Sequence, residues 1–166
     1  MFVKVFILAI TRSVTVDQMW FERVRLTGTR LPDARVLDAR FNTCDLSEAD
    51  WEKAHQTHVE VRESRLLGFK AVEARLQDMT VVGCDASFAL FFGAILVATR
   101  FAGRIVTEAS FQEADLTGVV FDRCGLGAAD VRGATLAGAD LRGARGRAAG
   151  RGDEPAGGSS WTRHKP

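Results

Sequence analysis

The sequence predicts an all-β chain wound into a stacked coil, and two periodic series of side chains carry that prediction. The first series runs in steps of five from Phe21 to Leu141, and 24 of its 25 members are apolar, with Gln56 the exception. The second series runs from Val24 to Ala144, two residues ahead of the first, and 22 of its 25 members are Ala, Cys, Ser, Thr or Val. A period of five excludes helical solenoids and leucine-rich repeats, whose units are several times longer.

The spacing of the two series indicates how each unit folds. Residues at i and i−2 face the same way in a short extended segment, and the other three residues of each unit then turn a corner. Repetition gives a polygon whose turns hydrogen-bond to the turns above and below, about 4.8 Å apart. The large series is expected to fill the axis, while the small series lets the wall close around it.

The five-residue unit resembles that of the pentapeptide-repeat proteins, written A-(D/N)-L-x-x. The copies that match best are Ala114-Asp115-Leu116, Ala139-Asp140-Leu141, Cys44-Asp45-Leu46 and Ala49-Asp50-Trp51. The resemblance implies a right-handed quadrilateral β-helix, a pentapeptide-repeat solenoid with four units per coil and about six coils over residues 21–145. Residues 1–20 are expected to form a strand or cap, and residues 146–166, rich in Gly, Ser and Pro, a disordered tail. Other family members often end in a capping or dimerising element, from which this tail departs.

Composition and charge favour a cytoplasmic location and give no overall polyanion-binding character. Lys plus Arg number 22 and Asp plus Glu 21, a net charge of +1. The N-terminal apolar run Val5 to Ile10 is too short for a membrane span and lacks a signal-peptide cleavage site. Cys44, Cys84 and Cys124 are 40 residues apart in one inward column. That places them too far apart for disulfides, so we expect buried, reduced thiols.

Two residues break the inward pattern, and no motif for catalysis accompanies it. Arg104 occupies a small inward position and is expected to bulge or escape outward, while Gln56 is expected to hydrogen-bond to the coil backbone or water. His55 and His58 face outward without metal ligands at recognisable spacing, which favours surface histidines. The sequence shows no nucleophile with a base, no phosphate loop and no carboxylate pair. It therefore predicts no enzyme, no metal and no cofactor.

Two outward surfaces are candidates for binding. A basic collar of Arg25, Arg30, Arg35 and Arg40 places one arginine on each side of the first coil. Nearby carboxylates favour solvated ion pairs over nucleic-acid binding. The apolar patch consists of Val72, Phe88, Leu90, Phe92, Ile95 and Val97. It is expected to bind a protein partner or a second copy, or else to be covered by the N-terminal segment.

The family resemblance suggests one specific partner. Its best-understood members are quinolone-resistance and related immunity proteins, which bind DNA gyrase or topoisomerase IV partly as shape and charge mimics of duplex DNA. A candidate acidic surface here comprises Glu73, Asp78, Glu108, Glu113, Asp115, Asp122, Asp130 and Asp140. Residues 21–145 hold 18 acidic and 16 basic residues, a net charge of −2 that is small for a DNA mimic. Gyrase binding is thus the specific hypothesis; a scaffold with another target, or a nucleic-acid binder using the collar, are the alternatives.

Overall fold

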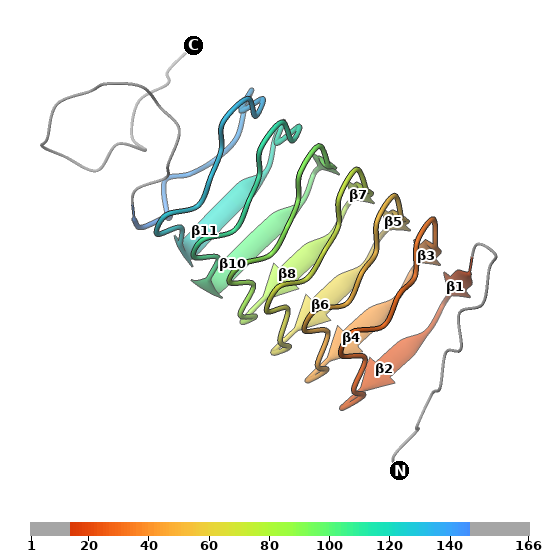
Figure 1. Cartoon of the computed structure of the whole chain (residues 1–166). Coiled ribbons are helices and arrows are strands. Elements are labelled where there is room, and N and C mark those ends of the chain that lie inside the picture. The colour runs from red at the N-terminus through yellow and green to blue at the C-terminus, as the bar shows by residue number, and fades with distance from the viewer. Residues whose placement is uncertain (1–13, 147–166) are drawn as a thin grey trace, which may run out of the picture.

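The chain is a rod of stacked coils in which short parallel strands form the walls. The computed structural model describes residues 14–146, apart from the side chains of Arg104 and Ile105. Within this range strands lie at intervals of 20 residues in two parallel sheets, and the two ends of the coil lie at opposite ends of the rod (Figure 1). The predicted all-β, four-sided β-helix is confirmed. No helix among these residues has the length and apolar character that a membrane span requires.

Two of the four sides are regular sheets. Side 1 holds β1 (Thr15–Asp17), β3 (Arg35–Leu37), β5 (His55–Thr57), β7 (Arg75–Gln77) and β9 (Ile95–Val97). Side 2 holds β2 (Trp20–Glu22), β4 (Arg40–Asn42), β6 (Glu60–Arg62), β8 (Thr80–Val82), β10 (Arg100–Ile105) and β11 (Val120–Gly125). Each strand pairs with the residues 20 positions away, as Phe21 does with Phe41. Because side 2 carries one strand per coil, its six strands in the described chain correspond to six coils.

The other two sides are held by single bridges in the same register. Side 3 starts with the bridge between Arg25 and Asp45, and side 4 with the bridge between Arg30 and Asp50. Segment 14–20, which was expected to belong to a strand or cap, contains β1 and the start of β2, and β1 pairs with β3. Residues 1–13 and 147–166, which carry the rest of the expected cap and tail, lie outside the described residues.

The corners explain why a unit of five residues suffices. Every fifth residue from Gln18 to Gly138 has a positive φ, and most of these residues are not glycine. A left-handed backbone is strained for residues with a Cβ atom, so something must hold it. The backbone N–H of most of these residues donates across the gap to the next coil, as from Asp38 to the Thr57 carbonyl at 3.1 Å. This ladder of bonds between coils fixes the turn whatever the side chain.

The core follows the two series closely. Every member of the large series from Phe21 to Leu126 is buried. Aromatic rings stack along the axis, with 4.6 Å between the ring centres of Phe21 and Phe41 and 5.0 Å between those of Phe91 and Phe111. Phe69 breaks the small series but is fully buried, because the neighbouring large position is taken by Ala71. A small residue in the large position therefore compensates for a large one in the small position.

One expectation about the core is wrong. Gln56 is 1% exposed, but neither its Nε2 nor its Oε1 has a hydrogen-bond partner in the described chain, so the expected bond to the coil backbone is absent. The indole Nε1 of Trp51, five residues earlier, is also buried without a partner. A buried amide without a partner costs stability, so this coil carries a defect. The backbone at Arg104 keeps the 20-residue register and pairs with Cys124, so the predicted bulge is absent, while the predicted escape concerns a side chain that is not described.

The three cysteines are buried and free. The thiol of Cys44 donates to the Phe21 carbonyl at 3.4 Å. Burial raises the pKa of Cys124 to about 11 and also raises that of Cys44. These thiols therefore stay protonated near neutral pH and are poor nucleophiles.

Candidate protein-binding surface

The apolar patch lies on the outside of the fifth coil and spreads over two sides and a corner. Leu90 and Phe92 lie on side 4, Ile95 and Val97 belong to β9 on side 1, and Phe88 occupies the corner between sides 3 and 4. Phe88, Leu90, Phe92 and Val97 are between 38% and 50% exposed. Val72 and Ile95 are half-buried. A cluster of this kind on a rigid wall is typical of a protein contact.

Sequence reasoning missed one member of this surface and the charges around it. Leu67, on side 3, is 45% exposed and lies next to Gly68, whose backbone N–H donates to the Ser87 carbonyl beside Phe88. On the N-terminal side of the patch, Arg65, Lys70 and Arg75 are exposed, while Glu108 and Glu113 are exposed on its C-terminal side. Both rows occupy outward positions of the five-residue frame, so the sequence carried the signal. The patch thus has a basic and an acidic edge.

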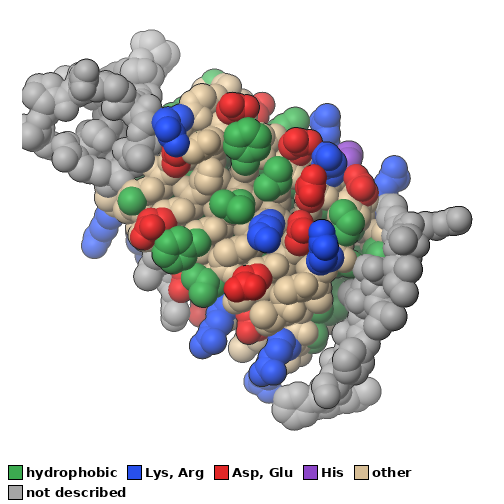
Figure 2. Space-filling model, in the orientation of Figure 1, with side chains coloured by type: hydrophobic (Ala, Val, Ile, Leu, Met, Phe, Trp, Pro, Cys, Tyr) green, Lys and Arg blue, Asp and Glu red, His purple; other side chains and the backbone are tan. Residues whose placement is uncertain are grey.

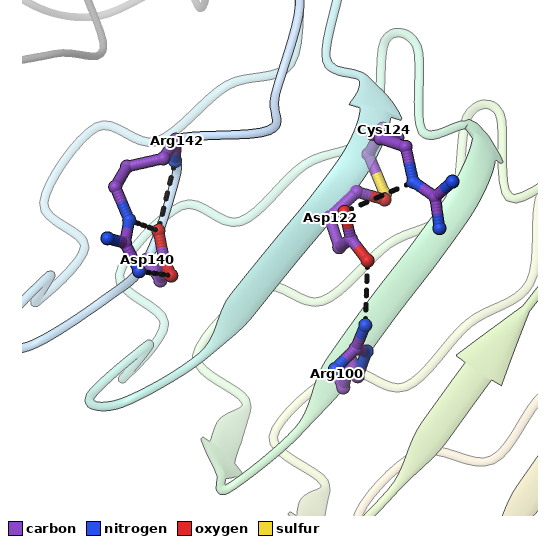
Figure 3. Close-up of polar contacts among 6 residues, drawn as sticks. Arg100, Asp122, Cys124, Asp140 and Arg142 are labelled. Atoms are coloured by element: carbon purple, nitrogen blue, oxygen red, sulfur yellow. Dashed lines mark hydrogen bonds and ion pairs between the residues drawn. The ribbon is translucent and has the colours of Figure 1, made fainter.

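Most of the candidate acidic surface is engaged in contacts within the chain. Asp140 accepts hydrogen bonds from Arg142, and Asp122 binds Arg100 at 2.7 Å (Figure 3). Asp130 contacts Arg132 and Gln112. On the corners, Glu73 lies 3.7 Å from Lys53, and Asp78 lies 3.6 Å from the imidazole of His58. Figure 2 shows a face of the rod on which acidic, basic and hydrophobic side chains are interspersed.

Several of these aspartates are also structural. Asp115, Asp130 and Asp140 each accept the backbone N–H of the residue two positions later, which closes a local turn at the start of a side. The Arg132 hydrogen bond holds the pKa of Asp130 well below its usual range, and the Arg142 hydrogen bond lowers the pKa of Asp140 to about 2. Hydrogen bonds from Thr117 lower the pKa of Asp115. Of the eight predicted residues, Glu108, Glu113 and Asp115 have no ion pair with a described side chain, and of these three the two glutamates are exposed.

The basic collar surrounds the rod and does not form a groove. Its arginines follow one another around the sides: Arg25 on side 3, Arg30 on side 4, Arg35 on side 1 and Arg40 on side 2. Arg30 lies 3.6 Å from Asp50, and Arg40 lies 3.4 Å from Glu60. Because a duplex contacts one side of a rod at a time, this arrangement offers few phosphate contacts.

Two other groups stand out on the surface. Both ring nitrogens of His58 face carboxylates, Asp38 at 3.3 Å and Asp78 at 3.6 Å, from the coils before and after it. The sequence search overlooked these carboxylates because they are 20 residues away. No group of three or more potential metal ligands occurs among the described residues. Trp20 is 77% exposed, and the guanidinium of Arg40 lies 5.4 Å from its ring centre.

Similarity to known proteins is found among solved structures. No protein-family model and no curated protein matches the sequence. Among solved structures, the chain is similar to QnrB1, a plasmid-mediated fluoroquinolone resistance protein, with 14% identity and a TM-score of 0.40 over 83% of this chain and 88% of that one. It is also similar to HetL, a pentapeptide repeat protein involved in heterocyst differentiation regulation in the cyanobacterium Nostoc. Here the identity is 19% and the TM-score 0.28, over 79% of this chain and 88% of HetL.

Proposed function

We propose that this four-sided β-helix of five-residue units is a non-enzymatic module that binds a partner protein through the apolar patch. The exposed cluster of Phe88, Leu90, Phe92 and Val97 carries the proposal. Large apolar side chains gain free energy when a partner removes them from water, by roughly 25 cal/mol per Å². The walls around the patch are already hydrogen-bonded from coil to coil, so side chains supply the recognition.

A photo-crosslinking amino acid placed at position 90 tests this proposal. In cells, it should capture one partner that the same group at Val82, on the opposite side 2, does not capture. With that partner purified, Leu90→Ser plus Phe92→Ser should weaken binding at least about tenfold, a loss of about 1.4 kcal/mol. Val82→Ser plus Ala102→Ser is the matched control and should leave binding unchanged. Capture of a second copy of the chain would make the patch a dimer interface; equal capture at both positions would reject the proposal.

DNA gyrase or topoisomerase IV is the specific partner that the family resemblance suggests. The supporting features are the rod shape of the coil (Figure 1) and the exposed carboxylates of Glu108 and Glu113. Asp122, Asp130 and Asp140 are already ion-paired within the chain. Charge mimicry of DNA would therefore depend on Glu108 and Glu113. A scaffold with a different target is the alternative.

Gyrase supercoiling assays separate the two. Excess protein should inhibit supercoiling or protect gyrase from a fluoroquinolone, and Glu108→Gln plus Glu113→Gln should weaken that effect. Asp140→Asn is the control, because Asp140 is already paired with Arg142. Neither inhibition nor protection would remove gyrase and leave the scaffold. Salt-sensitive retention on DNA would instead favour the collar as a nucleic-acid site.

A further inference from the structure

Phe88, at the centre of the apolar patch, is an unfavourable residue to leave exposed to water. Of the corner positions from Gln18 to Gly138, Phe88 is the one with a large apolar side chain, and the others are glycine, alanine or polar. Its φ of 59° is strained for a residue with a Cβ atom, and half of its surface is exposed. A large apolar side chain exposed at a corner position that elsewhere in the described coil holds glycine, alanine or a polar residue indicates that Phe88 has a contact to make.

We propose that the C-terminal tail supplies this contact by folding back along the rod and seating Trp161 on Phe88, Leu90 and Phe92. Residues 147–166 contain a single large apolar side chain, Trp161. An aromatic side chain gains both from burial and from ring contacts with the two phenylalanines. The tail thereby covers the patch within the same chain.

The start of the tail is within easy reach of the patch. Backbone hydrogen bonds connect the Phe88 corner to the equivalent positions of the following coils. The N–H of Phe88 donates to the Thr107 carbonyl, and the N–H of Glu108, in that next coil, donates to the Gly127 carbonyl. These positions form one column along the rod. A Cβ atom on Gly146 would lie 2.7 Å from Gly127 N, so the described chain ends on this column. Three coil steps of about 4.8 Å separate Gly146 from Phe88. Trp161 follows Gly146 by 15 residues, which can span roughly 50 Å when extended.

The charges next to Trp161 match the edge of the patch that the tail must cross. Arg163 and Lys165 follow the tryptophan closely. Glu108 and Glu113 are exposed on the C-terminal edge of the patch and have no ion pair with a described side chain. A second rod, by contrast, would lie flat on one side and leave either Leu90 and Phe92 or Val97 uncovered. A single extended segment, unlike a rod, can follow a patch that turns a corner.

This inference deepens the proposed function, because the tail would compete with the partner protein for the same patch. The tail contact itself does not require a partner. A partner would have to displace Trp161, which lowers its apparent affinity by the fraction of chains in which the patch is free. Removal of the tryptophan would therefore tighten partner binding.

Disulfide trapping in the full-length chain tests the contact. With cysteines placed beside the contact, in Leu67→Cys plus Thr162→Cys, oxidation should close an intramolecular disulfide about tenfold faster than in the same pair with Trp161→Ser added. Trp161→Ser is the matched control, because it keeps the chain length and both cysteine positions and removes only the indole ring. The native cysteines are buried and do not compete. Equal rates, or a disulfide formed only between two chains, would overturn the tail contact.

A second measurement needs no new cysteine. Trp161→Ser should raise the fluorescence of an apolar dye such as anilinonaphthalene sulfonate several-fold, whereas Thr162→Ser should not. Adding Phe88→Gly to Trp161→Ser should reverse the rise; an unchanged signal in Trp161→Ser would contradict the proposal. If crosslinking at position 90 still captures a partner while the two disulfide rates are equal, the proposed function stands and the tail contact alone is lost.

Discussion

The coil around Gln56 and the apolar patch around Phe88 break the same five-residue rule in opposite directions. Gln56 places a polar amide in the core, and its nitrogen and oxygen lack partners in the described chain. Phe88 places an aromatic ring on a corner where other coils have glycine, alanine or polar residues. Both cost stability, but only Phe88 is accessible to another molecule. The comparison teaches that departures on the outside of this rod point to recognition, whereas a departure inside is a packing cost.

The largest expected effect is a difference in stability between substitutions of two adjacent phenylalanines, one buried in the core and one on the outer surface. Phe91→Ala should destabilise the chain by about 3–5 kcal/mol, because it removes a ring stacked on Phe111 in the core. Phe92→Ala should cost less than about 1 kcal/mol, since a large part of that side chain is already exposed. Denaturant unfolding of both variants measures the difference. Similar losses would mean that the patch is part of the core.

The second-largest effect is a gain in stability expected when the buried amide of Gln56 is replaced. Gln56→Leu should stabilise the chain by about 1–3 kcal/mol, because it replaces an amide without partners by a side chain of similar size. Leu76→Gln, one coil along in the same column, should be destabilising and is the matched control. Unfolding midpoints in urea provide the measurement. A loss of stability in Gln56→Leu would show that the amide is satisfied in solution.

A smaller effect concerns the corner at Phe88. In the Trp161→Ser background, where the proposed tail contact is removed, Phe88→Gly should raise stability by about 1 kcal/mol, since glycine adopts a positive φ without strain. The same change should abolish dye binding and partner capture at the patch. Gly93→Ala, at the next corner, should lower stability by a similar amount. A less stable Phe88→Gly would mean that the ring already contributes a contact within the chain.

The smallest effect is a pH dependence at the C-terminal carboxylates. The pKa of Asp140 is lowered to about 2 by Arg142, below the ordinary 3.8 of aspartate. A lowered pKa in the folded chain stabilises it above the ordinary pKa, and this contribution disappears as the pH falls toward 2. Thermal midpoints of the parent chain and Asp140→Asn should thus converge between pH 4 and pH 2. A constant difference over that range would contradict the ion pair.

Much of this molecule could be predicted from the sequence because one register governs it. The inward series identified the buried rings of Phe91, Phe111 and Phe121, since a position every five residues always faces the axis. The same rule identified Phe88, Leu90 and Phe92 as outward. Phe69 fits in a small position because Ala71 leaves room in the neighbouring large position. A rule that considers one position at a time does not detect such a compensation.

The pairing of surface charges was harder to foresee. Asp130 with Arg132 and Asp140 with Arg142 are two residues apart, and such residues share a face of an extended segment. The sequence therefore contained the geometry, but a count of carboxylates treats each as available. The missing bonds of Gln56 depend on where its amide points in a packed core, which periodicity does not determine.

The corner that closes every fifth residue also sets how this rod can change length. Inserting one five-residue unit keeps each side chain inward or outward, but rotates everything beyond the insertion by a quarter turn. Inserting four units restores the original facing and only lengthens the rod. Duplication of a whole coil therefore preserves the orientation of the apolar patch relative to Trp20 on side 2, while a single-unit insertion between them turns the patch by one side.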